Sequence, residues 1–528
     1  YVLAKNTDDT PKTYDLSLYD LSFKGIGGIY TYTYSDFRAN FDGNGNIVKF
    51  YISRAYDDEV MYSGMFNQLV YSQRELAENV SDKQLEIGNF TIKNSIVYNP
   101  NKYSIMSQYN STVYPTSAGV HTCSTGGVAG LMKGAWKLQN ITWERDETIN
   151  DDLIKYDISG YRSVGGIVGK IDNSLSYSTY FTQEWIDANS SKMNDIDFVN
   201  CNLKGTNGNH IGVTELGSTD YYTRYGAYRF VGAGGLVGSI GTNLFAWHTV
   251  MSYGEINISS CDIDYVDILL KNKGYGGGFV GLLGTRYNPY SDYDSQYASI
   301  GNVTVDGKDA EGNVSHISNL TVCTDNTVNS VEDYSHGGMF GHIDAPRNKG
   351  IYGGNVVVTN YNLSDISVDG TRTKMHTADA GIDGDGGIIG SARADYVDLS
   401  YITFTGTNTI GTEYARKNNG GLIGRLYNVS CTNANNGAGF REDNTVNIYG
   451  CDLSGMNISA YNSCGGYIGH TMIEKINIGR ESTKDVIRNS TITSVNGDKI
   501  GGIVGYIYAN NGTMFQSWPV SNFINIDV

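Results

Sequence analysis

The stretch Gly-Gly-Ile-Val-Gly-Tyr-Ile at residues 501–507 is one copy of a seven-residue pattern that recurs along most of the chain. The pattern, called the glycine figure below, reads Gly-Gly, two apolar residues, Gly, a variable residue and usually another apolar residue. A unit of this kind buries its apolar face only by stacking on its neighbours, so the repetition predicts a solenoid. Copies begin at Gly126, Gly165, Gly234, Gly277, Gly337, Gly386, Gly420, Gly465 and Gly501.

A second pattern alternates with the glycine figure and places apolar residues three apart, such as Phe198 and Cys201, with Asn200 between them. Side chains of a flat strand alternate between faces, so both apolar residues point inward only if the strand bends. Asn tolerates the left-handed backbone angles of such a bend. We expect these amides to stack as an asparagine ladder, with ordinary surface turns as the alternative. The predicted ladder residues are Asn94, Asn140, Asn200, Asn319, Asn360 and Asn489.

Together the two patterns predict an all-β fold, a right-handed parallel β-helix of about eleven coils. Residues 1–528 form a single solenoid in this interpretation and are a segment of a longer chain. The interval between glycine figures varies from 34 residues (Gly387 to Gly421) to 69 (Gly166 to Gly235). The variation therefore lies in inserted surface loops.

Inside the glycine figure the pattern leaves one question open. Lys170 is replaced in other copies by Ser239, His342, Ser391, Arg425, His470 and Tyr506, which predicts that this position faces solvent. The residue two places before it, Val168 and its equivalents, is always apolar. Either the Gly-Gly pair bends the chain so that both apolar residues of the figure enter the core, or an outward apolar row is covered by another element.

The glycine figure resembles the GLUG motif, a short repeat of bacterial surface adhesins and of non-catalytic regions of immunoglobulin A proteases. The resemblance is carried by Gly-Leu-Val-Gly at 235–238 and Gly-Leu-Ile-Gly at 421–424. It implies a β-helix in an extracellular, cell-surface setting and transfers no catalytic residue. The chain contains no His-Glu-x-x-His sequence, so the zinc-peptidase activity of that family is not implied.

Composition restricts the class of partner. The net charge of −17 argues against nucleic acid, because phosphate neutralisation needs clustered Lys and Arg. No apolar run of about 18 residues is present, so we expect no membrane span. The seven cysteines show no Cys-x-x-Cys spacing, and their odd number excludes complete internal pairing. We interpret them as buried free thiols that act as small hydrophobes.

The loops carry the candidate binding residues, because function on a rigid solenoid usually resides there. We predict a non-enzymatic surface segment, an adhesin, stalk or filament component, that contacts a glycan or protein of a host or neighbouring cell. End-to-end self-association is a further expectation, since Phe523 to Val528 looks like the start of another coil. The candidate binding residues are Tyr221, Tyr222, Tyr225, Tyr290, Asp292, Tyr293 and Asp294.

The alternative function is a carbohydrate-active enzyme, a polysaccharide lyase or glycoside hydrolase, with acidic residues on one sheet face. Acid pairs and a basic residue that outward positions of adjacent coils bring together in a groove would distinguish it. No cofactor is expected, except that Asp383 and Asp385 alternate in a Gly-rich stretch and are candidates to share Ca²⁺. The full calcium-loop spacing is missing, so a solvated turn is the favoured interpretation.

Glycosylation sequons suggest a glycoprotein, and three of them place the acceptor at a predicted bend: Asn140, Asn319 and Asn489. If these amides are enclosed between coils, we expect the three sites to carry no glycan.

Overall fold

The computed structural model describes residues 1–17, 23–27, 37–54, 60–71, 84–101, 123–149, 154–172, 174–176, 195–216, 232–241, 250–252, 255–271, 274–284, 302–324, 334–345, 355–369, 384–394, 396–412, 418–426, 445–472, 475–494, 499–507 and 520–528. Over these ranges the regular elements are β-strands and no α-helix occurs. The prediction of an all-β chain is confirmed.

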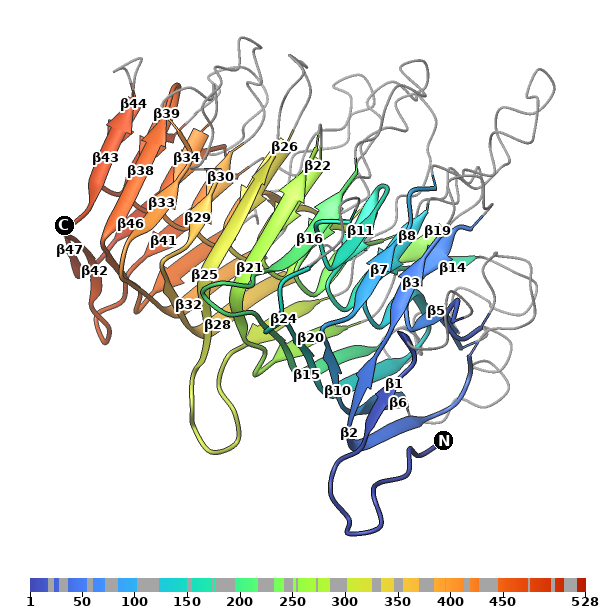
Figure 1. The fold of residues 1–528 in the computed structure, drawn as a ribbon. Coiled ribbons are helices and arrows are strands. Elements are labelled where there is room, and N and C mark those ends of the chain that lie inside the picture. The colour runs from blue at the N-terminus through green and yellow to red at the C-terminus, as the bar shows by residue number, and fades with distance from the viewer. Residues whose placement is uncertain are drawn as a thin grey trace.

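One turn of the chain consists of β10 (Trp136–Glu144), β11 (Ile158–Gly160), β12 (Ser163–Gly165) and β13 (Val168–Ile171). Each of these strands pairs in parallel with an equivalent strand of the preceding turn and of the following turn. Figure 1 shows the resulting stack, which advances from the N-terminal turn in blue to the C-terminal turn in red. The fold is therefore solenoid-like.

The strands belong to three long parallel sheets, called A, B and C. Sheet C precedes each Gly-Gly pair and contains ten strands: β4 (Tyr62–Ser63), β8 (Ser124–Gly126), β12, β17 (Gly232–Gly234), β22 (Gly274–Gly277), β26 (Tyr334–Gly337), β30 (Asp385–Gly386), β34 (Asn418–Gly420), β39 (Ser463–Gly465) and β44 (Lys499–Gly501). Sheet B follows the pair and also contains ten: β5 (Phe66–Val70), β9 (Ala129–Lys133), β13, β18 (Val237–Ile240), β23 (Val280–Gly284), β27 (Phe340–Ala345), β31 (Ile389–Ala394), β35 (Ile423–Leu426), β40 (Ile468–Thr471) and β45 (Val504–Ile507).

Sheet A contains the strands of the second sequence pattern and closes each turn. Its 25 strands are β1 (Thr13–Asp15), β2 (Phe41–Lys49), β3 (Tyr51–Ser53), β6 (Leu85–Lys93), β7 (Ile96–Tyr98), β10, β11, β15 (Ile196–Lys204), β16 (Ile211–Glu215), β20 (Ile256–Ser259), β21 (Ile263–Leu270), β24 (Val303–Asp306), β25 (Ser315–Thr324), β28 (Asn355–Ser364), β29 (Ser367–Val368), β32 (Tyr396–Thr405), β33 (Asn408–Ile410), β36 (Thr445–Tyr449), β37 (Asp452–Ser454), β38 (Met456–Ala460), β41 (Lys475–Ile478), β42 (Asp485–Arg488), β43 (Thr491–Ser494), β46 (Val520–Phe523) and β47 (Ile526–Asp527). A separate antiparallel pair joins β14 (Ser174–Ser176) to β19 (Val250–Ser252).

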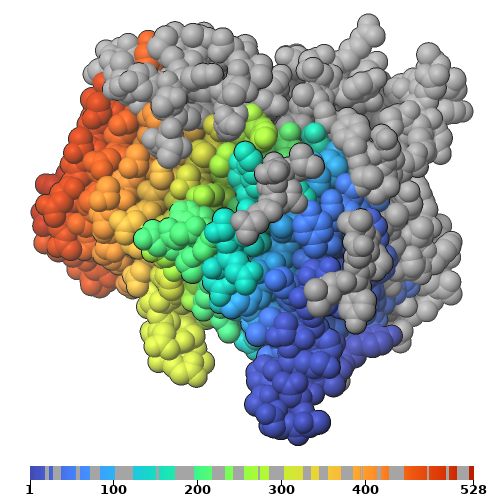
Figure 2. Space-filling model, in the orientation of Figure 1, coloured from blue at the N-terminus to red at the C-terminus, as the bar shows by residue number. Residues whose placement is uncertain are grey.

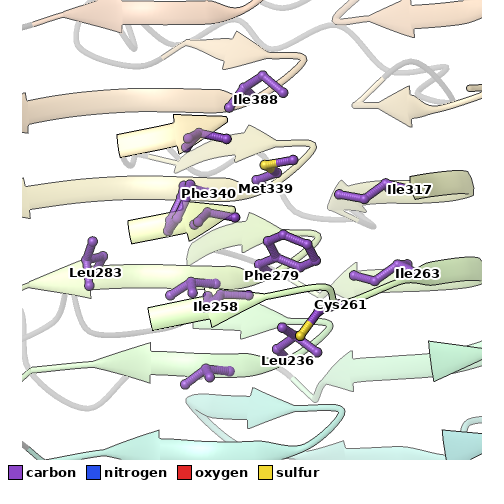
Figure 3. Close-up of a cluster of buried hydrophobic side chains, with 14 of the residues drawn as sticks. Leu236, Ile258, Cys261, Ile263, Phe279, Leu283, Ile317, Met339, Phe340 and Ile388 are labelled. Carbon is purple, nitrogen blue, oxygen red and sulfur yellow. The ribbon is translucent and has the colours of Figure 1, made fainter. Parts of the chain in front are cut away.

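The glycine figure sends both of its apolar residues into the core. Ile167, Val168 and Ile171 all belong to one buried hydrophobic cluster and have no exposed surface. Val168 pairs with Val237 and Ile171 pairs with its own counterpart in β18, while the pairing skips the glycine between them. The chain bends at Gly166 and Ile167, between β12 and β13, which confirms the buried alternative, and β13 bends again at the third glycine. Figure 3 shows Leu236, Phe279, Met339 and Ile388 from successive turns among these core side chains.

The glycine figure requires glycine because the successive turns leave no space for a side chain, and not because the backbone angles exclude other residues. A Cβ atom at Gly235 would lie 2.1 Å from the carbonyl oxygen of Gly278 in the next turn. A Cβ atom at Gly169 would lie 2.6 Å from the amide nitrogen of Thr125 in the preceding turn. The turns approach each other closely enough here for direct hydrogen bonds, such as Leu236 N to Phe279 O at 3.0 Å.

The asparagine bends are confirmed, but they form two rows instead of one ladder. All six predicted residues have positive φ angles, between 46° for Asn94 and 58° for Asn360. Strand register places Asn140, Asn200 and Asn360 in one row and Asn94, Asn319 and Asn489 in another. The prediction of a single ladder through all six is therefore wrong.

Within the first row a short ladder does form. The Asn140 amide nitrogen donates to Asn89 Oδ1, and that of Asn200 donates to Asn140 Oδ1, each at 2.9 Å. Asn89, with φ of 60°, also fits the second pattern, because it lies between Ile87 and Phe90, but it was not among the predicted ladder residues. Asn140, Asn200 and Asn489 are solvent-exposed, so the expectation that bend amides are enclosed is wrong for them. The argument for an unglycosylated Asn489 therefore fails.

The expected solvent-facing row of the glycine figure is also buried. Lys170 is 5% exposed and His342 is 6% exposed, and Ser239, Ser391, Arg425 and His470 are buried as well. None of these side chains belongs to the apolar core cluster, and three contact sheet C: Ser239 Oγ lies 2.6 Å from Ser163 Oγ, Ser391 Oγ lies 2.8 Å from Ser335 Oγ, and the His342 ring stacks on Tyr275. The bend at the third glycine turns this position toward the neighbouring sheet, which periodicity alone did not indicate.

The cysteine interpretation is confirmed for the described part of the chain. Cys123, Cys201, Cys261, Cys323, Cys451 and Cys464 are free and buried, and Cys431 lies outside the described residues. Burial raises the pKa of the Cys123 thiol to about 12. These thiols are inert small hydrophobes in the core.

No described helix has the length and apolarity that a membrane crossing needs. Figure 2 shows two described segments that project from the body, the N-terminal residues in dark blue and the turn between β24 and β25 in yellow. That turn is closed by an antiparallel bridge between Lys308 and Val314.

The close approach of the turns predicts that replacing two different glycines by alanine will cost very different amounts of stability. Replacing Gly235 by Ala should destabilise the fold by about 1–3 kcal/mol or more, because the added methyl group meets backbone atoms that cannot move independently. Replacing Gly208 by Ala should change stability by less than about 0.5 kcal/mol, because nothing lies within 4 Å of a Cβ atom there. Urea denaturation midpoints of the two variants test this, and equal midpoints would contradict the packing described.

Candidate functional site

Most of the binding residues predicted from the sequence cannot be placed. Tyr221, Tyr222, Tyr225, Tyr290, Asp292, Tyr293 and Asp294 lie outside the described residues, as does Asp383. Asp385 is described and is fully buried in β30. The favoured interpretation of Asp385 as part of a solvated turn is therefore wrong.

Asp385 instead belongs to a buried cluster with His336 and Asp369. One ligand atom from each residue can be chosen so that all three lie within 4.8 Å of one another, and all three residues have no exposed surface. His336 Nδ1 lies 3.1 Å from Asp385 Oδ1, and the His336 backbone amide donates to the same oxygen at 3.1 Å. It is the one group of three or more such residues at this spacing in the part of the chain that the structure describes.

The strands explain why these side chains meet. The residue immediately before each Gly-Gly pair points into the solenoid, and successive copies form one register row of sheet C. This row is apolar at Val164 and Ala233 and becomes polar at His336, Asp385 and Asn419. Asp369 directly follows β29, where its φ of 51° ends the strand at the corner between sheets A and C.

Other polar side chains hold the cluster in place. Thr324 Oγ1 lies 2.8 Å from His336 Nε2, so both ring nitrogens of the imidazole have hydrogen-bonding contacts. The Asp385 backbone amide donates to Asn419 Oδ1 at 3.0 Å. The order of hydroxyl, imidazole and carboxylate resembles that of a hydrolytic triad. Because Thr324 is itself buried, the arrangement as it stands offers no surface to a substrate.

A second polar constellation lies on the outer surface of sheet A near the C-terminal turns. The Asn447 amide donates to the Tyr396 hydroxyl at 2.8 Å, and that hydroxyl donates to Asp398 Oδ2 at 2.9 Å. The Asn477 amide donates in turn to Asn447 Oδ1 at 2.8 Å. This is an asparagine ladder on an outward row, which the sequence analysis did not predict.

Two tyrosines flank this ladder. Tyr401 is 48% exposed and meets Tyr449 edge to face, with the ring centroids 5.6 Å apart. The guanidinium carbon of Arg480 lies 3.3 Å from the Tyr449 ring centroid. The outer tyrosine face, as we call it, consists of Tyr396, Asp398, Tyr401, Asn447, Tyr449 and Asn477.

A third group contains three acids near the N-terminal turns. Burial, assisted by the neighbouring Asp197 and Glu255 carboxylates, raises the pKa of Asp195 to about 6. Asp197 and Asn257 occupy outward positions of paired strands and are hydrogen-bonded at 2.9 Å. On the neighbouring strand β10, Lys137 is the register partner of Asp197.

The buried row of the glycine figure contains two titratable groups with shifted pKa values. Burial lowers the pKa of Lys170 to about 8. Burial also lowers the pKa of His470 to about 3, assisted by the charges of Arg425 and Lys499. His470 is therefore neutral in the native protein near pH 7 and resists protonation on acidification.

Comparison of the chain with protein-family models, with curated proteins and with solved structures found no match. The chemistry of these three groups is therefore the basis on which a function is inferred.

The depressed pKa of His470 predicts acid sensitivity. Below about pH 6.5 the unfolded chain binds a proton at His470 that the native protein does not bind, so this residue removes up to about 1.4 kcal/mol of stability per pH unit until its native pKa is reached. Replacing His470 by Gln should flatten the fall in melting temperature between pH 6.5 and pH 4.

The control for this prediction is His316→Gln, because the hydrogen bond that the His316 ring donates to the Asp262 carboxylate raises the pKa of His316. Its protonation stabilises the native protein below pH 6.5, so the control should melt lower in acid and almost unchanged at pH 8. Parallel pH profiles for both variants would show that neither histidine has the stated environment.

Proposed function

We propose that this chain is a non-enzymatic, extracellular segment of a cell-surface protein, a right-handed parallel β-helix of about eleven coils that presents a recognition surface. The resemblance of its glycine figure to the GLUG motif of surface adhesins supports this setting. The partner is a glycan or protein on a host or neighbouring cell. The Tyr/Asp-rich stretches around Tyr221 and Tyr290, which lie outside the described residues, remain candidate binding segments within this proposal.

The observation that carries the proposal is the position of Tyr401. It is exposed, yet its φ is 52°, a conformation that costs an ordinary residue about 1–2 kcal/mol. The register row of Tyr401 has Asn360 in the preceding turn and Gly450 in the following turn, which adopt this conformation more readily. A strained aromatic residue retained on the surface without burial is a mark of selection for contact with something else.

The surroundings of Tyr401 suit recognition of a sugar or a polar peptide. Tyr401 and Tyr449 supply aromatic surface with few rotatable bonds, and Asn447 and Asn477 supply donors and acceptors fixed by a ladder that ends at the buried Asp398. Because the strands beneath are fully paired, little conformational entropy is lost on binding. Rigid display of this kind is what a stalk or adhesin needs.

The test replaces Tyr401 by Asn and measures binding to a glycan array and to cultured cells. The replacement removes the aromatic ring but keeps a residue that tolerates the positive φ, so the melting temperature should stay equal or rise. We expect binding to fall at least about tenfold, which corresponds to the loss of one aromatic contact of about 1.4 kcal/mol.

The matched control is Tyr265→Asn, since Tyr265 has nearly the same backbone angle, 51°, but packs against His210 at another part of sheet A. This variant should bind as the unmodified protein does. Equal loss in both variants, or binding unaffected by Tyr401→Asn, would contradict the assignment of the outer tyrosine face.

A second candidate function, cleavage of an acidic or neutral polysaccharide, is favoured by the three acids near Asp195. Adjacent turns bring Asp197 and its neighbours together with Lys137, and a half-buried carboxyl with a pKa of about 6 suits a general acid. These side chains supply the acids and the basic residue that the enzymatic alternative requires.

Activity assays on a polysaccharide panel decide between the two functions. The enzymatic candidate predicts cleavage that is lost by at least about a hundredfold in Asp195→Asn and that follows an apparent pKa near 6. Cleavage that is equally strong in Asp195→Asn, or no cleavage of any substrate, would remove this candidate. Glycan binding without cleavage supports the non-enzymatic proposal.

A further inference from the structure

The buried cluster of His336, Asp369 and Asp385 combines two carboxylates with one imidazole where no side chain is exposed. Burial of an ionised carboxylate is costly unless a positive charge or hydrogen bonds compensate it. Here two carboxylates and one imidazole lie together in one buried place. A dication at the same place balances both and leaves the imidazole neutral.

We propose that His336, Asp369 and Asp385 bind a divalent first-row transition-metal ion, with Zn²⁺ as the best fit. The ligands are His336 Nδ1 and one carboxylate oxygen from each aspartate. This assigns a metal to Asp385 that differs from the calcium considered from the sequence, because an imidazole nitrogen suits zinc and its neighbours in the series, whereas calcium prefers oxygen ligands.

The geometry agrees with shared coordination. Zn–N and Zn–O bonds of about 2.1 Å place neighbouring ligand atoms about 3.0–3.4 Å apart in octahedral or tetrahedral sites. His336 Nδ1 and Asp385 Oδ1 are 3.1 Å apart. The third ligand atom lies within the same 4.8 Å group, so a small ion needs only minor side-chain movement to contact all three.

The surrounding contacts match those of a metal-bound histidine. A ligating imidazole usually donates its other N–H to an acceptor that fixes ring orientation and tautomer. Thr324 Oγ1, 2.8 Å from Nε2, is placed to accept that proton, which leaves the Nδ1 lone pair directed at the cluster. The Asp385 main chain is held by its hydrogen bond to Asn419.

The ion would connect two adjacent turns of the solenoid. His336 belongs to β26, while Asp385 belongs to β30, its pairing partner in the next turn, and Asp369 closes β29 at the corner of that same turn. The site is closed to substrate, so the role is structural. It is independent of which partner the outer surface binds.

To test this, the full chain is unfolded in denaturant with EDTA. The EDTA is then removed, and the chain is refolded with or without Zn²⁺. Metal content is measured by mass spectrometry after gel filtration, and stability by thermal unfolding. We expect about one bound Zn²⁺ per chain and a higher melting temperature in the zinc-refolded protein. Refolding with Co²⁺ should give visible absorption bands typical of nitrogen and oxygen ligands.

Variants identify the ligands. His336→Gln and Asp369→Asn should abolish stoichiometric zinc and the zinc-dependent shift, and Thr324→Val should weaken zinc binding by about 10- to 100-fold. His342→Gln is the control, because His342 is a buried histidine of the same turn that bonds Ser391 outside the cluster. It should bind zinc normally.

Several results would overturn the proposal. An unmodified protein that refolds without retaining zinc, cobalt or manganese would show that the cluster does not bind a divalent ion. Zinc retained by Asp369→Asn and His336→Gln would place the metal elsewhere. If these variants fail to fold, the metal content and the cobalt spectrum of the unmodified protein decide the matter alone.

Discussion

The constraint on which the structure depends is the close approach of successive turns at the Gly-Gly pair. The second glycine of each pair lies so close to the carbonyl oxygen of the next pair that a Cβ atom would be about 2 Å from it, as at Gly166 against Gly235. This approach allows sheets B and C to share one hydrogen-bonded register through ten strands each. Every apolar row of the core follows from that register, because equivalent residues of neighbouring turns lie directly over one another.

The fold was largely predictable from sequence because the constraint is local. Three glycines at fixed spacing indicate the tight arch, and Asn200 between Phe198 and Cys201 indicates a bend that the structure confirms with a φ of 51°. The sequence did not predict which bend residues of different turns are equivalent. Asn94 and Asn140 look equivalent in sequence, yet the true counterpart of Asn140 is Asn89, because each turn contains two bends and insertions hide which bend is which.

The same limit applies to the candidate sites. His336 and Asp385 are 49 residues apart and are brought together by register, whereas Asp369 reaches them around a corner. The sequence signal for this cluster was a polar residue immediately before the Gly-Gly pair, at a position where other turns have Val164 and Ala233. Lys170 and His342 were assigned to solvent because strand periodicity does not reveal a bend at the third glycine, which turns that position against sheet C. Which polar side chains meet in this fold therefore depends on which turns lie beside each other.

Stacking register is the central claim, and engineered disulfides test it directly. Thr304 and Val357 are 53 residues apart and are paired neighbours on adjacent strands β24 and β28, at the strand spacing of about 4.8 Å that a disulfide can span. Asp398 lies in the same row one strand further, at about twice that distance. Oxidation of Thr304→Cys with Val357→Cys should give an intramolecular crosslink that peptide mapping detects, while Thr304→Cys with Asp398→Cys should not. A crosslink only in the second pair, or in neither, would contradict the register and with it the solenoid described here.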